Sequence, residues 1–221
     1  MLTPSAQYDY QHWYKLVPDH SLSQVIMLST AELKQLRHDK PIDLLVTISY
    51  PVFVRLTSRS PKDCTSEAYE YDCKAESMSD IMRMILLSQR CTDDIIDYYE
   101  SDMPLGIVLQ PFNHDIKLRK EYRLFIFNCN LVAVSAVTEP NDLLNEDDLR
   151  MLKSYIESLT DLHKHFTQYI ADIAMCNHKF VFIEINPYCP AIVDGMLFNW
   201  EEDKRLLFPE STPSIPLYRY D

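Results

Sequence analysis

Glycine is nearly absent from this sequence, and that scarcity limits how the chain can bind a phosphate group. Only Gly106 and Gly195 occur among its 221 residues. A Walker loop or a dinucleotide-binding fingerprint needs several glycines, because backbone amides must come close to the phosphates. Both motifs are therefore excluded, and a bound nucleotide would have to be held by side chains and a metal ion.

The composition is that of a globular protein with an acidic surface. Hydrophobic residues make up 47% of the chain, enough for the core of one large domain or two smaller lobes. The 33 acidic residues outnumber the 21 Lys and Arg residues, and the formal net charge is −12. This charge has the wrong sign for a protein whose main partner is a phosphate backbone, so we expect no nucleic-acid partner.

The cysteines and the first residues predict a cytoplasmic protein. The six cysteines are spread along the chain without a C-x-x-C pair, which is typical of reduced thiols. The opening segment, MLTPSAQYDYQHW, lacks a basic region followed by an apolar run. No apolar stretch approaches the roughly 20 residues that span a bilayer, so we expect no membrane partner.

The first half of the chain combines strand and helix patterns. Residues 41–56, PIDLLVTISYPVFVRL, are rich in β-branched side chains and predict strands that end before the turn TSRSPKD. Apolar residues at helical spacing predict an amphipathic helix over residues 77–90. Ser77 is placed to cap its N-terminus, with Asp80 three residues on.

The second half predicts a hairpin, a helix and a second hairpin. GIVLQPF and YRLFIFNCNLVAVSAV have strand patterns, and NCN at 128–130 has the composition of a hairpin turn. The acidic segment 139–166 places its apolar residues on one side, which predicts a helix covering a sheet. QYIADIAMCNHKFVFIEINP predicts the second hairpin. The fold class is therefore α+β, with lobes at 1–105 and 106–221 and a mostly antiparallel sheet in the second.

Asp172, Glu184 and Asn186 could form part of a metal site. Glu184 and Asn186 lie two residues apart on the last predicted strand, KFVFIEINPYCP, and Asp172 lies on the strand before it. Strict alternation would put Phe180 and Phe182 on the face of Glu184 and Asn186. Two carboxylates and an amide oxygen are hard donors, which suit Mg²⁺.

The length of the turn decides whether Asp172 faces Glu184. Residues directly opposite each other in an antiparallel pair point to the same face. A two-residue turn would put Asp172 opposite Ile183, whereas a turn from Cys176 to His178 would bring it to the face of Glu184. The metal site therefore requires an odd turn or a β-bulge. The alternative is an ordinary strand whose charges protect a sheet edge, and the spacing alone favours that alternative.

Several separate stretches resemble, in order, the motifs of the cell division cycle protein 123 family. They are FVRLTSRSPKD, SMSDIMRMILLSQRCTDDI, IVLQPF, KEYRLFIFNCNLVAVSA, YIADIA and VFIEINPYCPAIVDGMLFNWEED. The resemblance covers most of the chain, and the run from Phe182 to Trp200 is its most specific part. It implies an ATP-grasp-like fold of two α+β lobes, and a function as an ATP-binding assembly factor for eukaryotic translation initiation factor 2.

The resemblance also implies which residues bind ATP and Mg²⁺. The positions are Arg55, Thr57, Ser60, Gln110, Pro111, Phe112, Arg123, Asp172, Glu184 and Asn186. Arg55 falls where the family has a phosphate-binding lysine, and the segment 110–112 would meet the adenine. Arg123 is placed for a phosphate. The implied metal ligands are Asp172, Glu184 and Asn186.

Three functions remain open from the sequence. The first is an ATP- and Mg²⁺-binding assembly chaperone for the gamma subunit of translation initiation factor 2. The second is an ATP-grasp ligase or phosphoryl-transfer enzyme, although no general base stands out. The third is a divergent binding protein that has lost ATP. Arginine at position 55, glutamate at position 184 and SAVTEPNDLL in place of a Ser-Gln-Arg-Asp run are the departures from the family pattern.

Overall fold

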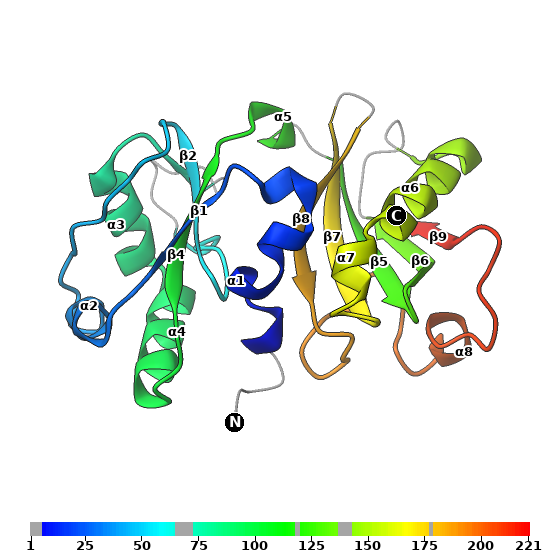
Figure 1. Cartoon of the computed structure of the whole chain (residues 1–221). Helices are drawn as coiled ribbons and strands as arrows, with labels where there is room; N and C mark the ends of the chain where they lie inside the picture. Colours follow the sequence, from blue (N-terminus) through cyan, green and yellow to red (C-terminus); the bar gives the residue numbers. More distant parts are fainter. Residues whose placement is uncertain (1–5, 65–72, 118–119, 137–142, 177–178) are drawn as a thin grey trace. The chain divides into compact units, whose positions relative to one another are not determined.

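The chain forms two compact units, each built around one sheet (Figure 1). The computed structural model describes residues 6–64, 73–117, 120–136, 143–176 and 179–221. The units are Met1–Asn113 and His114–Asp221. They divide after Asn113, whereas the boundary predicted from the sequence falls after residue 105. The strand β4 (Gly106–Pro111) accounts for the difference, because it pairs with strands of the N-terminal unit.

The N-terminal unit has a four-stranded sheet of order β1-β4-β2-β3 whose neighbours are antiparallel. Its other strands are β1 (Gln24–Met27), β2 (Val52–Leu56) and β3 (Lys74–Ala75). Its helices are η1 (Ala6–Tyr8), α1 (Tyr10–Trp13), η2 (Tyr14–Leu16), η3 (Pro18–His20), α2 (Thr30–Leu36), α3 (Met78–Leu87) and α4 (Gln89–Glu100). One face of the sheet packs against the apolar sides of α2, α3 and α4 in a continuous core.

The predicted amphipathic helix is present as α3, followed at once by α4. The Ser77 side chain accepts a hydrogen bond from the Asp80 amide at 3.2 Å, so the predicted N-cap is confirmed. Ser88 ends α3 and caps α4, accepting from the Cys91 amide at 3.1 Å. A side-chain acceptor at this position satisfies an amide that the helix leaves without a partner.

The strand predicted from the first part of residues 41–56 is not formed. Only β2 forms in this segment, and residues 41–50 contain no helix or strand. The Gln24 side chain, on β1, donates through Nε2 to the Leu45 carbonyl at 2.6 Å and accepts through Oε1 from the Thr47 amide at 2.8 Å. A side chain therefore takes backbone groups that a neighbouring strand would have offered to β1.

The C-terminal unit has a five-stranded sheet of order β8-β7-β5-β6-β9. Its strands are β5 (Lys120–Phe127), β6 (Asn130–Ala136), β7 (Tyr169–Cys176), β8 (Lys179–Asn186) and β9 (Leu217–Tyr220). Its helices are α5 (His114–Lys117), α6 (Glu146–Ser158), α7 (Thr160–His163) and α8 (Lys204–Leu207). Among the described strands of this sheet only the pairing of β9 with β6 is parallel, so the predicted α+β class and mostly antiparallel sheet are confirmed.

The two predicted hairpins and the helix between them are present. Asn128 and Cys129 form the first turn with φ angles of 50° and 62°, between the paired residues Phe127 and Asn130. Positive φ at both central residues is the geometry that matches the twist of a two-residue hairpin. Residues 139–142 of the segment predicted to be helical lie outside the described residues; in the rest of it α6 begins at Glu146 and ends at Ser158, and α7 follows from Thr160.

The two faces of the C-terminal sheet have different coverings. The helix α6 contacts β6 on one face (Figure 1). On the other face, Phe125, Ala133 and Ile170 pack against Val193 and Phe198. The segment 187–208, called here the covering segment, thus lies over the second face. No helix in the described parts of the chain is long and apolar enough to cross a bilayer.

Candidate functional site

A β-bulge in the last hairpin places Asp172 directly opposite Glu184. Counted from the closing pair of the hairpin, a regular ladder would put Asp172 opposite Ile183. The register instead shifts by one between Asp172 and Ile173, and Asp172 pairs with Glu184. The bulge that the metal hypothesis required is therefore confirmed. Residues 177–178, part of the predicted turn, lie outside the described residues.

The bulge also reverses the alternation along β8. Phe182 pairs with Ile173 and is 1% exposed, so it belongs to the core on the α6 face. Glu184 and Asn186 lie on the opposite face, with Asp172. The expectation that Phe180 and Phe182 share the face of Glu184 and Asn186 is wrong, because one extra residue in the strand changes the face of everything beyond it.

Arg123 forms the central contact of this face. Arg123 lies on β5, directly opposite Asp172 on β7. Its Nε donates to Asp172 Oδ1 at 2.8 Å, and its Nη2 donates to Oδ2 at 2.7 Å. Its Nη1 donates to the Asp194 carbonyl of the covering segment at 2.9 Å. This is the bidentate geometry in which a guanidinium binds a carboxylate most strongly.

The charges around Arg123 stabilise one another. Burial works against the guanidinium charge, but the hydrogen bonds and charge of Asp172, followed by the charges of Glu184 and Asp194, raise the pKa of Arg123 above its ordinary value. The pair is only partly accessible, with side-chain exposures of 19% for Arg123 and 17% for Asp172. The positive charge of Arg123 therefore offsets the repulsion between Asp172 and Glu184, which lie opposite each other on adjacent strands.

The donor set on this face suits a hard divalent cation. Asp172 and Glu184 supply carboxylate oxygens from adjacent strands, and Asn186 supplies an amide oxygen on the same face. Within the described ranges, no group of three or more His, Cys, Asp or Glu side chains is arranged to hold a metal. A divalent cation on this face would meet two carboxylates and one amide oxygen of the chain, and Arg123 already bonds to both oxygens of Asp172.

A second bidentate ion pair anchors the covering segment to β9. Arg219 donates to both carboxylate oxygens of Asp203, at 2.5 and 2.7 Å, and to the Leu197 carbonyl at 3.1 Å. The Leu197 amide donates to Ser135 Oγ on β6 at 3.1 Å. These contacts fix the segment that presents the Asp194 carbonyl to Arg123.

The predicted nucleotide residues of the N-terminal unit lie on and beside β2 and β4. Arg55 pairs with Val108, and Gln110 lies two residues further along β4, so both are on the face away from the helical core. Arg55 is 4% exposed, its Nε donates to the Leu56 carbonyl at 3.1 Å, and its guanidinium lies 5.5 Å from the centre of the Tyr10 ring. The guanidinium is thus held beneath the N-terminal helical turns.

Thr57 connects strands rather than facing solvent. It is fully buried, and its Oγ1 accepts from the Gly106 amide at 3.1 Å. A Cβ at position 106 would lie 2.9 Å from the Ile26 carbonyl and 3.2 Å from Thr57 Cγ2, which explains the glycine there. Ser60 is also buried, at 5% exposure.

Gln110, at the predicted adenine position, is held by a polar cluster that the sequence did not reveal. Its Nε2 lies 3.1 Å from Tyr10 Oη and 2.6 Å from His20 Nδ1. Tyr10 Oη also contacts Ser23 Oγ at 2.6 Å. The strand β4 ends at Pro111. The amide of the next residue, Phe112, donates to the Pro51 carbonyl at 3.1 Å.

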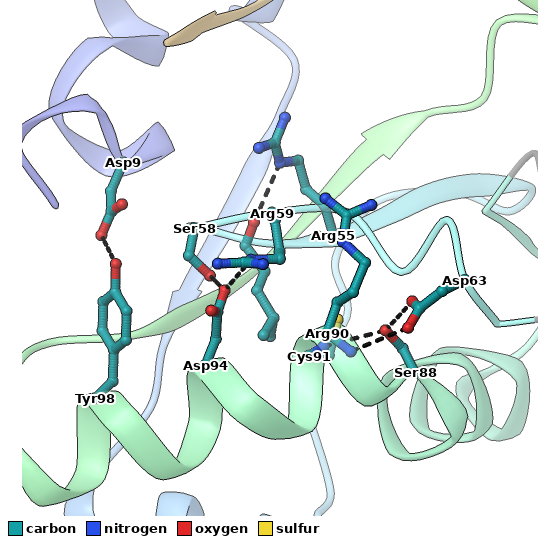
Figure 2. A network of polar contacts seen from close by, with 11 residues as sticks. Asp9, Arg55, Ser58, Arg59, Asp63, Ser88, Arg90, Cys91, Asp94 and Tyr98 are labelled. Atoms are coloured by element: carbon teal, nitrogen blue, oxygen red, sulfur yellow. Dashed lines mark hydrogen bonds and ion pairs between the residues drawn. The ribbon is translucent and has the colours of Figure 1, made fainter. Parts of the chain in front are cut away.

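The helix α4 carries a further row of polar contacts (Figure 2). Tyr98 Oη donates to Asp9 Oδ2 at 2.7 Å. One turn earlier, Asp94 Oδ2 accepts from Ser58 Oγ at 2.5 Å and from Arg59 Nε at 2.7 Å. These contacts connect the N-terminal turns and the loop after β2 to one helix.

Burial raises the pKa of Asp9 to about 6, and hydrogen bonds from Tyr98 and Gln11 only partly offset this effect. Because the folded-state pKa lies above the ordinary value of 3.8, Asp9 favours folding when protonated, and this contribution is lost as the pH rises through 6. The difference corresponds to about 3 kcal/mol at most.

We therefore expect Asp9→Asn to stabilise the protein at pH 8 and to change its stability little at pH 4. The amide keeps an acceptor for Tyr98 but carries no buried charge. Thermal unfolding of both proteins at the two pH values measures this, with the exposed Asp43→Asn as the control. If the melting temperatures of wild type and Asp9→Asn changed equally with pH, the raised pKa of Asp9 would be contradicted.

Comparison with known proteins identifies the family and the fold. A family model described as D123 matches residues 13–214. A sequence search among curated proteins gave no match. The structure of Cdc123 from Schizosaccharomyces pombe matches with a TM-score of 0.67 and 18% identity, over 97% of this chain and 95% of that one. A C-terminally truncated form of it gives 0.65 and 17%, with the same coverage.

A more distant structure also matches. It is a D-alanine-D-alanine ligase from Helicobacter pylori, with a TM-score of 0.47 and 12% identity over 91% of this chain and 60% of that chain. The family model spans most of the chain, and the matches to the two Cdc123 structures show the same fold over 97% of it. The chain therefore belongs to the D123 family.

Proposed function

We propose that this protein binds ATP together with Mg²⁺ and acts as an assembly chaperone for translation initiation factor 2, through its gamma subunit. Membership of the family supports the chaperone function. The observation that carries the ATP and Mg²⁺ proposal is the β-bulge, because it turns Asp172, Glu184 and Asn186 to one face of the sheet.

The residues of this face have complementary tasks in the proposal. Glu184 and Asn186 would offer oxygen donors to the cation, together with Asp172. Arg123 would bind a phosphate oxygen, because a guanidinium fork fits a phosphate as well as a carboxylate. When bound, Mg²⁺ would neutralise phosphate charge. Because the chain has only two glycines, it lacks a glycine-rich phosphate loop and would have to bind the phosphates through side chains and a metal ion.

The proposal also assigns nucleotide-binding roles to residues of the N-terminal unit. Gln110, Pro111 and Phe112 would meet the adenine, with Gln110 oriented by Tyr10 and His20. Arg55 would contribute positive charge for the phosphates. Thr57 and Ser60 would shape the site from buried positions, since the Thr57 hydroxyl already accepts from Gly106.

Calorimetry with ATP tests the nucleotide part of the proposal. We expect wild type to bind ATP in the presence of Mg²⁺, and Glu184→Ala to weaken that binding at least about tenfold, because it removes a metal ligand. Glu201→Ala, an exposed glutamate on the covering segment, is the control. Binding that is equal with and without Mg²⁺, or that Glu184→Ala leaves unchanged, would contradict the site.

Association with the gamma subunit tests the chaperone part. We expect purified protein to retain the isolated gamma subunit on affinity resin, with little release of ADP. Sustained ADP release that depends on an added acid and amine would favour the ligase alternative. Absence of ATP binding in wild type and Glu184→Ala alike, with the gamma subunit still retained, would favour a binding protein that has lost ATP.

A further inference from the structure

We propose that Arg123 and a divalent cation compete for Asp172, so that a phosphate group must draw Arg123 away before the cation binds tightly. The inference rests on the proposed function for the identity of the phosphate, which is that of ATP. It adds an order of binding and a coupling between the two ligands.

The geometry of the pair is the basis of the competition. Arg123 Nε and Nη2 occupy both oxygens of Asp172, at 2.8 and 2.7 Å. A cation that uses Asp172 must displace at least one of these hydrogen bonds or approach beside the guanidinium. Glu184, directly opposite Asp172, also contributes to the electrostatic stabilisation of Arg123. The guanidinium of Arg123 and a bound metal would therefore both be stabilised by the carboxylates of Asp172 and Glu184.

Electrostatic repulsion disfavours the presence of both cations at Asp172 at the same time. A divalent ion on Asp172 and Glu184 would lie next to a permanently charged guanidinium, and the partial burial of the pair limits screening by water. A phosphate removes the conflict. It offers Arg123 a bidentate partner of greater negative charge, and it supplies further oxygens to the metal.

The covering segment gives Arg123 a fixed pivot for this exchange. The Nη1 group donates to the Asp194 carbonyl at 2.9 Å, a contact separate from the two that hold Asp172. The guanidinium can therefore exchange one partner while it keeps another. The pair that Arg219 of β9 forms with Asp203 of the covering segment fixes that segment through contacts of its own.

The consequence is a reciprocal coupling. If ATP releases Asp172 from Arg123, ATP tightens metal binding by a certain factor, and the metal must tighten ATP binding by the same factor. Removing the guanidinium removes the two hydrogen bonds that a cation would have to displace at Asp172. Metal alone then binds more tightly, and most of the coupling disappears.

Calorimetry with Mn²⁺ and Mg²⁺ in the absence of nucleotide tests the competition directly. We expect Arg123→Gln to bind either metal about tenfold more tightly than wild type, within the usual range of coupling between sites. Arg123→Lys, which keeps a charge but loses the fork, should fall between them. Arg150→Gln is the control, because it removes an exposed arginine of the same unit, which pairs with Glu146 on α6, and should leave metal binding unchanged.

A second titration adds a non-hydrolysable ATP analogue. In wild type the analogue should tighten Mn²⁺ binding about tenfold, and in Arg123→Gln by less than threefold. Metal binding to Arg123→Gln no tighter than to wild type, including no binding to either, would overturn the inference. Circular dichroism and thermal unfolding of each variant establish that a folded protein is being titrated.

The outcomes separate the inference from the proposed function. If wild type binds the analogue and metal, but Arg123→Gln shows the same coupling, the inference fails and the proposed function stands. If Arg123→Gln gains metal affinity while no protein binds the analogue, the competition stands and the proposed function fails.

Discussion

A Gly195→Ala variant is expected to lose about 3 kcal/mol of unfolding free energy, and Mg²⁺-dependent ATP binding with it. A Cβ at this position would lie 2.1 Å from the Phe198 carbonyl oxygen and 3.3 Å from Trp200 Nε1. The first contact is with backbone, in a turn closed by the Phe198 amide donating to the Gly195 carbonyl at 3.0 Å. The turn must open to accept the methyl group.

The damage should spread because this turn belongs to the covering segment. Phe198 is 3% exposed and packs 5.2 Å from the Phe125 ring, measured between ring centres. Asp194, the residue before the glycine, presents its carbonyl to Arg123. Opening the turn therefore disturbs both the aromatic core and the site.

Urea unfolding, followed by ATP titration, measures both effects. The matched control is Met196→Gly in the same turn, since Met196 has a φ of 53° and is 37% exposed. Glycine adopts this conformation without strain, so we expect a change within about 1 kcal/mol. An unchanged urea midpoint for Gly195→Ala would show that the covering segment does not pack as described.

The second large effect concerns the Arg123–Asp172 pair. Asp172→Leu leaves a mostly buried guanidinium without its bidentate partner, and we expect a loss of about 3 kcal/mol. The double variant Arg123→Met/Asp172→Leu should recover most of that loss, because apolar side chains of similar size can replace a buried ion pair. Neither variant should bind ATP with Mg²⁺.

This cycle distinguishes folding from ligand binding. Stability is measured by chemical denaturation of wild type, the two single variants and the double variant. Recovery of stability without recovery of ATP binding is the expected result. A double variant as unstable as Asp172→Leu would mean that the strands need this pair for packing, and ATP binding by the double variant would remove both residues from the site.

Local patterns were sufficient for much of the fold. The cap at Ser77, the hairpin turn at Asn128 and Cys129, and the order of hairpin, helix and hairpin depend on nearby residues, and the structure contains them. The short strand β9 was not predicted. Its four residues acquire their structure by pairing with β6, some 80 residues earlier in the chain, which no local pattern reports.

The candidate site could be predicted from the sequence only in part, for the same reason. The need for a bulge followed from counting residues, but the Arg123–Asp172 pair joins residues 49 positions apart in the sequence. Tyr10 and His20 gave no signal at all, because their role depends on contact with Gln110, 100 and 90 positions away. Such contacts come from tertiary structure and not from the composition of any segment.

The bulge in β8 has a consequence for how this protein can change over time. Substitutions anywhere in the hairpin leave Glu184 and Asn186 on their present face, provided that the ladder keeps its one-residue shift beside Asp172. A single insertion or deletion that removed this one-residue shift would turn both side chains toward α6, even though Glu184 and Asn186 themselves were unchanged. Inheritance of the site therefore depends on the number of residues in the hairpin as much as on their identity.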